Sequence, residues 1–306
     1  MHKEFSFKTK DNFQLEGFVW EHNTTKKATL VICHGMAEHI LRYDEFASFL
    51  ALQGYVVVGY DQRGHGRTLK NPEDIGYMSD DDHFMQLVSD LSEIVNYSKS
   101  LNEKLPIFIL GHSMGSFVLE RLLTLNKVQI DGAIISGSNL NKGLKYSFGK
   151  KIIKMIVKKN GRRYRSKFVN YLSIGSFNKK FKPANTNVDW LSSDPKVCQA
   201  YVDDELCGAI FPASYYMDLI NGFKAINNNL NNISKSLPIL IFSGEDDPVG
   251  LFGKGIKKLY DRLLNIGVKD LTFTLYPNGR HEMLNEVNKI TVYNDVLEWL
   301  NSRINK

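Results

Sequence analysis

The sequence predicts a doubly wound α/β fold with one inserted segment, on three observations. Short apolar runs alternate with longer amphipathic segments, the N-terminal apolar runs have a period of two, and this rhythm stops between about residues 140 and 222. Short apolar runs that end in Gly, Ser or Asp are typical of buried parallel strands. Their alternation with helices favours a mostly parallel sheet with helices on both faces.

The elements can be placed in order along the chain. Residues 5–20 read FSFKTKDNFQLEGFVW and alternate around a Lys-Asp-Asn turn, which predicts an antiparallel hairpin at the sheet edge. Further strands are expected at ATLVICHG, YVVVGYD, IFILGHS, GAIISGS, ILIFSGE and LTFTLYP. Apolar residues at helical spacing predict helices over 42–52, 83–100, 114–125, 254–265 and 285–302. The chain therefore divides into a core, 1–139 and 223–306, and an inserted, mainly helical cap, 140–222.

Composition indicates an ordinary globular chain. Its 306 residues are 43% hydrophobic, which is enough for one large core. The first residues, MHKEFSFKTK, carry charges where a signal peptide needs an apolar run. Cys33, Cys198 and Cys207 form no C-x-x-C and cannot all pair, which fits a reducing compartment. We therefore expect a cytoplasmic protein, and neither a nucleic-acid motif nor a Gly-rich phosphate loop is present in the sequence.

One serine occupies the turn between a predicted strand and a predicted helix. The segment GHSMG places Ser113 between Gly111 and Gly115, directly before the helix expected over 114–125. Small residues at both ends let strand and helix approach closely, so that the serine can adopt a strained backbone. The N-terminus of the helix favours negative charge beside it. Ser113 is therefore predicted to be a nucleophile; the alternative is a Gly-rich turn without chemistry.

A serine nucleophile needs a base that takes its proton and a carboxylate that orients the base. In α/β-hydrolases these groups follow in the chain order Ser, then Asp or Glu, then His. Of the eight histidines, only His281 lies beyond the inserted segment, in the loop YPNGRHEML. The carboxylate is expected after the preceding strand, where position alone does not choose among Glu245, Asp246 and Asp247. A metal site at HEMLN is not supported, because the second histidine of H-E-x-x-H is missing.

Five motifs resemble those of one known family. They read HGMAEH, DQRGHGRT, GHSMG, SGEDDPVG and YPNGRHEMLNE, in that order along nearly the whole chain. They are similar to the monoacylglycerol lipase and lysophospholipase group of the α/β-hydrolase superfamily, within its serine aminopeptidase-like branch, although the inserted segment matches poorly. The resemblance implies an α/β-hydrolase fold, with a mostly parallel central sheet and an inserted helical cap. It also implies an enzyme that needs no metal or organic cofactor.

The resemblance further implies roles for particular residues. The family's G-x-x-D falls on Gly244 to Asp247, so Asp247 is implied to orient His281. One oxyanion donor is the backbone N–H after the glycine of HGMAEH, here Met36, and the second is the N–H of Met114. The other polar residues of these motifs are expected to brace loops by hydrogen bonds. They are His34, Glu38, His39, Asp61, Arg63 and His65.

These residues predict a serine carboxylic ester hydrolase that acts on lipid-like monoacyl esters, a monoacylglycerol or a lysophospholipid, through an acyl-enzyme. The same triad serves amides, so a serine aminopeptidase or amide hydrolase is the alternative. Against it, HGMAEH stands where prolyl aminopeptidases carry a Gly-Gly-Pro-Gly run. A ligand-binding protein that keeps the fold without turnover is a third possibility, and the intact triad argues against it.

The cap carries the positive charge of the chain. Residues 142–182 contain fourteen Lys and Arg, and no acidic residue lies between Asp131 and Asp189. Without these fourteen, the formal charge of +6 becomes −8 for the rest of the chain. One predicted helical face in this segment carries Phe148, Ile152, Ile153, Ile156 and Val157. Such a face with lysines around it favours peripheral contact with an anionic membrane, or alternatively a helix packed over an acyl pocket with solvated lysines.

Overall fold

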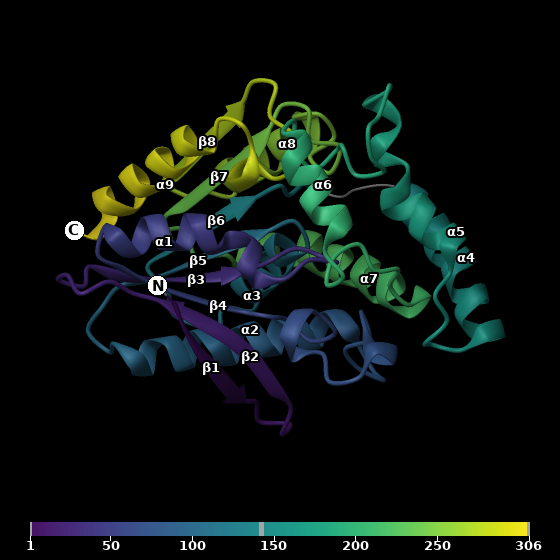
Figure 1. Ribbon diagram of the computed structural model, residues 1–306, viewed down its shortest axis with the longest axis horizontal. Coiled ribbons are helices and arrows are strands. Elements are labelled where there is room, and N and C mark those ends of the chain that lie inside the picture. The colour runs from purple at the N-terminus through teal and green to yellow at the C-terminus, as the bar shows by residue number, and fades with distance from the viewer. Residues whose placement is uncertain (1, 141–143, 305–306) are drawn as a thin grey trace.

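The chain folds around one eight-stranded sheet (Figure 1). The computed structural model describes residues 2–140 and 144–304, without the side chains of 144–148. The strands are β1 (His2–Lys8), β2 (Gln14–Trp20), β3 (Ala28–Cys33), β4 (Tyr55–Tyr60), β5 (Ile107–His112), β6 (Gly132–Ser136), β7 (Ile239–Gly244) and β8 (Leu271–Tyr276). Their order is β1-β2-β4-β3-β5-β6-β7-β8; the β1–β2 and β2–β4 pairs are antiparallel and the other pairs are parallel. The predicted edge hairpin and mostly parallel sheet are confirmed.

The core helices follow the predicted ranges closely. They are α1 (Asp44–Leu52), α2 (His83–Leu101), α3 (Met114–Leu125), α8 (Lys254–Asn265) and α9 (Lys289–Ile304). The largest difference is at α9, which was expected to begin at residue 285. Glu286 is extended there, with φ −79° and ψ 166°, so the helical run is interrupted after a short 3-10 turn.

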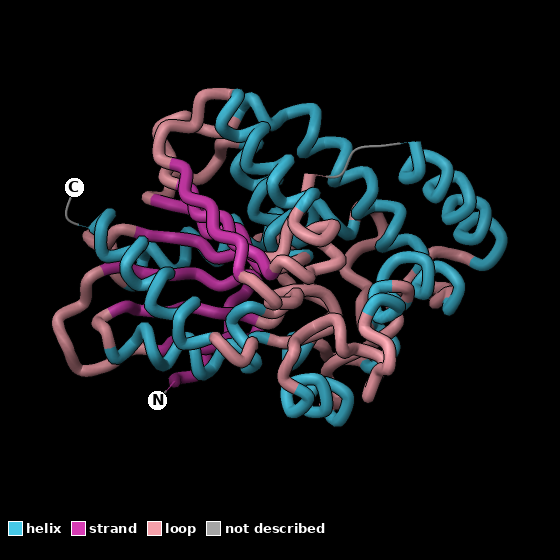
Figure 2. The backbone as a smooth tube through the Cα atoms, turned by 90° about the horizontal axis from the view of Figure 1, so that it is seen from above, coloured by secondary structure: helices cyan, strands magenta, loops and turns pink. Residues whose placement is uncertain are grey.

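Two hydrophobic layers cover the two faces of the sheet. Successive residues of a strand point to opposite faces. Val31 accordingly packs in a cluster with α2, α3 and α8, while Leu30 and Ile32 pack in a second cluster with α1 and α9. All residues of β3, β4, β5, β6 and β7 are buried, as a sheet covered on both faces requires, whereas the edge strand β8 is mostly half-buried. Figure 2 shows the strands as a layer between helices.

The described residues between β6 and β7 form helices and turns, without a strand. The helices are α4 (Leu144–Asn160), α5 (Lys167–Asn170), α6 (Pro195–Asp203) and α7 (Ala213–Asn229), and short turns join them. They extend from one end of the sheet (Figure 1). Since α7 runs through residue 222 and packs against α2 and α3 as well as α4, the expected boundary falls inside a helix. The division into core and cap stays a prediction.

The close approach of two loops at Gly244 gives a test of the packing. A Cβ at Gly244 would lie 2.1 Å from Gly279 O and 2.2 Å from Arg280 O, both backbone atoms. Backbone atoms move less readily than the end of a flexible side chain. We therefore expect Gly244→Ala to lower the free energy of unfolding by about 1–3 kcal/mol or more. Gly149→Ala on α4, where nothing lies within 4 Å of the new Cβ, is the control and should be neutral or stabilising by up to about 1 kcal/mol. Urea unfolding measures both; equal stability of the two variants would contradict the packing at Gly244.

Candidate active site

Ser113 lies on the turn between β5 and α3 with φ 51° and ψ −118°, a conformation that strains a non-glycine residue. Its N–H donates to Ser136 O at 2.9 Å, which ties the turn to the end of β6. A Cβ at Gly111 would lie 2.5 Å from Gly115 O, and one at Gly115 would lie 2.0 Å from Cys33 O. Both glycines are therefore required by packing, and they hold Ser113 partly exposed between buried neighbours.

Asp247 and His281 form a buried pair in the loops after β7 and β8. His281 Nδ1 lies 2.9 Å from Asp247 Oδ1, and the two side chains are 2% and 0% exposed. Asp247 also accepts the Val249 N–H at 2.8 Å and the Ser243 hydroxyl at 2.9 Å. The two carboxylates before it in the chain are exposed. Of the three carboxylates left open by position, Asp247 is thus the one that lies against His281.

Burial acts in one direction, and nearby charges and hydrogen bonds in the other, on the pKa values of Asp247 and His281. Burial disfavours charge, so alone it would raise the pKa of Asp247 and lower that of His281. The partner's opposite charge and the hydrogen bond between them act against burial, and the pKa of Asp247 is lowered while the pKa of His281 is raised. An imidazole in this setting can hold a proton taken from a neighbouring hydroxyl.

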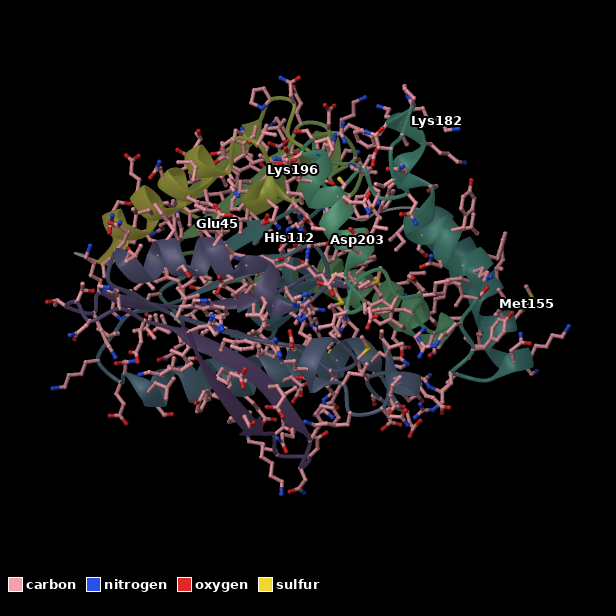
Figure 3. The ribbon with its side chains drawn as sticks, in the orientation of Figure 1. Glu45, His112, Met155, Lys182, Lys196 and Asp203 are labelled. Carbon is pink, nitrogen blue, oxygen red and sulfur yellow. The ribbon has the colours of Figure 1, made fainter. Side chains whose placement is uncertain are left out.

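The turn at Ser113 and the loop of His281 meet around His112 and Gly137. The rings of His112 and His281 have centroids 4.6 Å apart. A Cβ at Gly137 would lie 2.9 Å from His281 Cε1 and 3.0 Å from His112 Cε1. His112 is buried and lies near the middle of the view in Figure 3. The residue before the serine therefore packs directly against the histidine.

The loop with one expected oxyanion donor, Met36, borders Ser113, and the other expected donor, Met114, follows Ser113 in the chain. A Cβ at Gly35 would lie 3.3 Å from Ser113 Cβ, so the loop that continues to Met36 borders the serine. Met114 is the first residue of α3, and the first N–H groups of a helix have no acceptor within the helix. The N–H of Met114 is therefore free of the helical hydrogen-bond ladder.

An arginine that sequence reasoning missed, with a side chain only 10% exposed, joins the loop after β3 to the histidine loop. Arg42 donates to the two carboxylate oxygens of Glu282 at 2.5 and 2.6 Å, and to Glu38 Oε2 at 2.8 Å. Glu38 Oε1 accepts the Gly35 N–H at 2.6 Å and the Tyr43 hydroxyl at 2.9 Å. Glu38 braces its loop as expected. Arg42 and Glu282 stand 240 positions apart, and no local pattern signals such a pair.

The other polar residues of the motifs also hold loops. His34 Nε2 accepts the Gln62 N–H at 3.0 Å, and Arg63 donates to both carboxylate oxygens of Asp90 at 2.7 and 3.0 Å. Burial lowers the pKa of His34 and of His65 to about 3, so both imidazoles stay neutral at ordinary pH. Their contacts agree with the bracing role that the sequence predicted.

A segment of the cap supports the histidine loop. The rings of Trp190 and His281 have centroids 5.0 Å apart, and the His281 N–H donates to Trp190 O at 3.3 Å. The Glu282 N–H donates to Leu191 O at 2.7 Å. Trp190 and Leu191 are thus hydrogen-bonded to the histidine loop, and sequence reasoning missed these contacts because no motif falls in that segment.

Known proteins are similar to this chain over nearly its whole length. A family model described as "Serine aminopeptidase, S33" matches residues 24–288. The monoacylglycerol lipase of Mycolicibacterium smegmatis is 26% identical over 290 residues, which cover 94% of this chain and 92% of that protein.

Two solved structures show the same fold. A thermostable carboxyl esterase from Bacillus coagulans matches with a TM-score of 0.91 at 21% identity, over 99% of both chains. A soluble variant of the monoglyceride lipase from Saccharomyces cerevisiae, in complex with a substrate analogue, matches with a TM-score of 0.76 at 20% identity, over 98% of this chain and 94% of that one. The predicted α/β-hydrolase fold is thereby confirmed.

The buried histidines of this region have opposite pKa shifts, which NMR can test. Burial lowers the pKa to about 3 for His34, His65 and His83 and to about 4 for His112. For His281, burial also lowers the pKa, but the charge and hydrogen bond of Asp247, together with the charges of Glu282 and Glu38, raise it above the usual 6.5. We expect an NMR titration to show His281 protonating above pH 6.5, and Asp247→Asn to lower its pKa, while Asp246→Asn leaves it unchanged. Protonation of wild-type His281 below pH 6.5 would contradict the pairing.

Proposed function

Since the chain belongs to the serine aminopeptidase family of α/β-hydrolases, we propose that it hydrolyses monoacyl lipid esters, a monoacylglycerol or a lysophospholipid, with Ser113 as the nucleophile. Family membership and the lipase relatives make it a lipase-like ester hydrolase. The catalytic residues, the acyl-enzyme and the class of ester are our proposal. The observation that carries it is the buried Asp247–His281 pair packed against His112, which directly precedes a serine on a strained turn.

In the proposed reaction Ser113 Oγ attacks the ester carbonyl carbon, and its proton passes to His281 Nε2, the ring nitrogen that does not face Asp247. The N–H groups of Met36 and Met114 bind the oxyanion. The intermediate then expels the alcohol, which takes the proton from His281, and leaves an acyl-Ser113 ester. Water attacks that ester with His281 as base, and the carboxylic acid is released.

The surroundings of the oxyanion donors suit an acyl chain. Met114 belongs to the same hydrophobic cluster as the cap residues Ile153 and Val169, and Met36 packs at the edge of that cluster. Apolar walls with a few placed polar groups are typical of sites for lipid-like ligands. An aminoacyl substrate is the second candidate, because the matching family model is named for an aminopeptidase and the same triad cleaves amides.

We expect Ser113→Ala to lower the hydrolysis of p-nitrophenyl esters by more than about four decades and to abolish labelling by a fluorophosphonate. Alanine is no larger than serine, so circular dichroism and thermal unfolding should be unchanged. The wild type, assayed on esters of increasing acyl length beside aminoacyl nitroanilides, should prefer the esters. Labelling that persists in the variant would place the nucleophile elsewhere, and a preference for nitroanilides would favour the aminopeptidase.

The choice of acid is tested by two neighbouring substitutions of equal chemistry. We expect Asp247→Asn to reduce kcat by about four decades, because the histidine loses the group that fixes its tautomer. Asp246→Asn removes an exposed carboxylate one residue away and should keep kcat within a factor of a few. Equal losses, or the reverse order, would reject Asp247 as the orienting residue.

We also propose that the cap brings the enzyme to anionic lipid surfaces. The apolar face expected on α4 is turned inward: Ile153 is buried, and Ile156 and Val157 pack partly buried against the core cluster. Lys142 and the side chain of Phe148 lie outside the described residues. This inward orientation agrees with the alternative in which the helix packs over the core. Contact with a lipid surface must therefore come from other residues of the cap.

The outer side of the cap combines cations with exposed apolar side chains. Five large apolar residues here are 44% to 64% exposed: Met155, Tyr164, Phe168, Tyr171 and Leu172. Both α4 and α5 pack on α7, and Figure 3 shows Met155 at the outer edge of the molecule. Apolar side chains among lysines suit the boundary between headgroups and acyl chains. Within residues 2–140 and 144–304, no helix is both long and apolar enough to cross a membrane.

Matched lysine substitutions test the surface contact. The cap variant changes Lys151, Lys154 and Lys158 to Gln, and the control variant changes Lys254, Lys257 and Lys258 on α8. Each cation near an anionic leaflet contributes about 1 kcal/mol, so we expect the cap variant to bind anionic vesicles roughly 100-fold more weakly, with little change in the control. Cosedimentation with neutral and anionic vesicles at low and high salt measures this, since salt should weaken the contact. Equal binding to neutral vesicles, or equal loss in both variants, would reject the proposal.

A further inference from the structure

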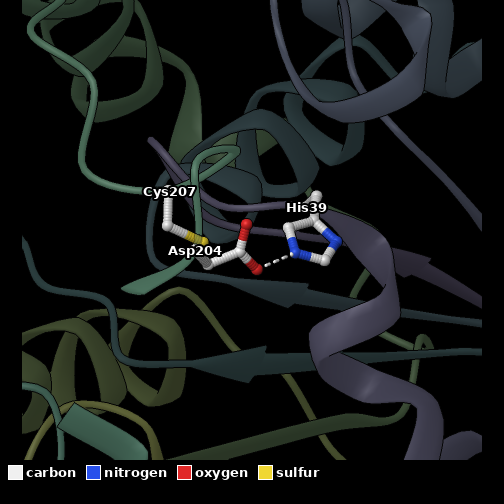
Figure 4. Close-up of side chains that lie close together, drawn as sticks. All are labelled: His39, Asp204 and Cys207. Carbon is white, nitrogen blue, oxygen red and sulfur yellow. Dashed lines mark hydrogen bonds and ion pairs between the residues drawn. The ribbon is translucent and has the colours of Figure 1, made fainter. Parts of the chain in front are cut away.

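Three potential metal ligands meet where the cap touches the loop after β3 (Figure 4). In the described part of the chain, His39, Asp204 and Cys207 each offer one ligand atom, and these atoms all lie within 4.8 Å of one another. His39 Nε2 lies 2.8 Å from Asp204 Oδ2. Asp204 follows the last residue of α6, and Cys207 comes three residues later. None of the three takes part in the proposed ester hydrolysis.

We propose that His39, Asp204 and Cys207 bind a zinc ion, with water in the fourth position. An imidazole nitrogen, a thiolate sulfur and a carboxylate oxygen are the donor types that zinc takes in proteins. Magnesium and calcium take oxygen donors, so a thiolate and an imidazole select against them. The chemistry of the three side chains thus points to zinc among the common divalent ions.

The spacing of the donors is close to what zinc requires. Zinc bonds of about 2.0 to 2.3 Å in a tetrahedron hold the donor atoms roughly 3.3 to 3.6 Å apart. The present separations, from 2.8 Å between His39 and Asp204 to at most 4.8 Å, bracket that range. The Leu206 N–H donates to Asp204 Oδ1 at 2.8 Å, which leaves Oδ2 for the ion. The Cys207 N–H donates to Asp204 O at 3.0 Å, so one turn carries both ligands.

An ion can replace the hydrogen bond between His39 and Asp204, because nothing else holds the imidazole ring by a hydrogen bond within the described residues. The residue is 7% exposed, and its Nδ1 is buried without a hydrogen-bond partner among the described residues. No bond from Nδ1 therefore fixes the ring. When Nε2 binds an ion, the imidazole proton can occupy Nδ1, which gives the neutral tautomer that metal ligation requires.

Charges and protons balance in this step. The Asp204 carboxylate and the Cys207 thiolate neutralise the charge of Zn²⁺, and a neutral His39 imidazole binds the ion through Nε2. Burial raises the pKa of the Cys207 thiol, so the sulfur holds a proton until an ion displaces it. When the ion binds, the Cys207 thiol releases its proton to solvent.

An ion at this position would join the cap to the loop that carries Met36. The Gly208 N–H and the Tyr201 hydroxyl both donate to Ala37 O, at 2.9 and 2.8 Å. Ala37 has a positive φ of 58° and directly follows Met36. The His39–Asp204 hydrogen bond is a third link between the same two segments, and zinc would replace it with bonds to His39, Asp204 and Cys207.

Cobalt titration of the reduced, metal-free full chain tests the site without an activity assay. A thiolate ligand gives Co²⁺ a charge-transfer absorption in the near ultraviolet, and tetrahedral coordination gives intense visible bands. We expect one Co²⁺ per chain with both signatures, and their loss on addition of one equivalent of Zn²⁺. Wild-type protein that shows no charge-transfer band would overturn the proposal.

Single-cysteine variants assign the ligand. Partners in the second coordination layer of zinc sites change affinity by about 10- to 100-fold, so loss of a ligand in Cys207→Ser should weaken zinc binding by at least about 100-fold and remove the charge-transfer band. Cys198→Ser is the matched control, because Cys198 is also buried but directs its sulfur to Val188 O and Ser192 O. A band that survives in Cys207→Ser, or is lost in Cys198→Ser, would reject the site. Should Cys207→Ser not fold, His39→Gln must weaken binding in the same way.

Discussion

The guanidinium of Arg42 joins the loop after β3 to the loop of His281 through Glu38 and Glu282, and the rest of the candidate site depends on this link. Taking three charged side chains out of water costs several kcal/mol per ion. Hydrogen bonds to the carboxylate oxygens must offset this cost. Here all four oxygens of Glu38 and Glu282 accept hydrogen bonds. Arg42 overcomes the effect of burial and holds the pKa of Glu282 at about 2, so this carboxylate stays charged. The group carries one net negative charge, and both carboxylates help to raise the pKa of His281.

Parallel strands explain why short motifs from distant parts of the chain converge on this group. The loops with Met36, Ser113, Asp247 and His281 follow β3, β5, β7 and β8. These strands are all parallel to one another, so their carboxyl ends lie at one edge of the sheet. Each loop needs only a local turn to present its side chain, and the close glycine contacts at Gly115 and Gly244 set how near the loops lie.

The cap has an inner part and an outer part with different physical character. The inner part is bonded to the site: Trp190 and Leu191 hold the histidine loop, and Tyr201 and Gly208 hold Ala37. The outer part, on α4 and α5, carries exposed cations and apolar side chains. The proposed lipid contact uses the outer part, and the proposed zinc ion lies in the inner part. The proposed lipid surface and the proposed zinc ion would therefore each bind a segment that already contacts the core.

The sequence by itself determined the order of strands and helices, the edge hairpin and the turn at Ser113, because periodicity and glycine spacing are local properties. Chain order pointed to His281 as the candidate base. Among Glu245, Asp246 and Asp247, residues alone left the acid open, and the family resemblance pointed to Asp247. The tertiary structure separated the three, since one carboxylate lies buried on His281 and the others face solvent. Only the tertiary structure joined Arg42 to Glu282 and His39 to Asp204, pairs 240 and 165 positions apart. Contacts at such separations depend on how the sheet and cap pack, and no local pattern carries that information.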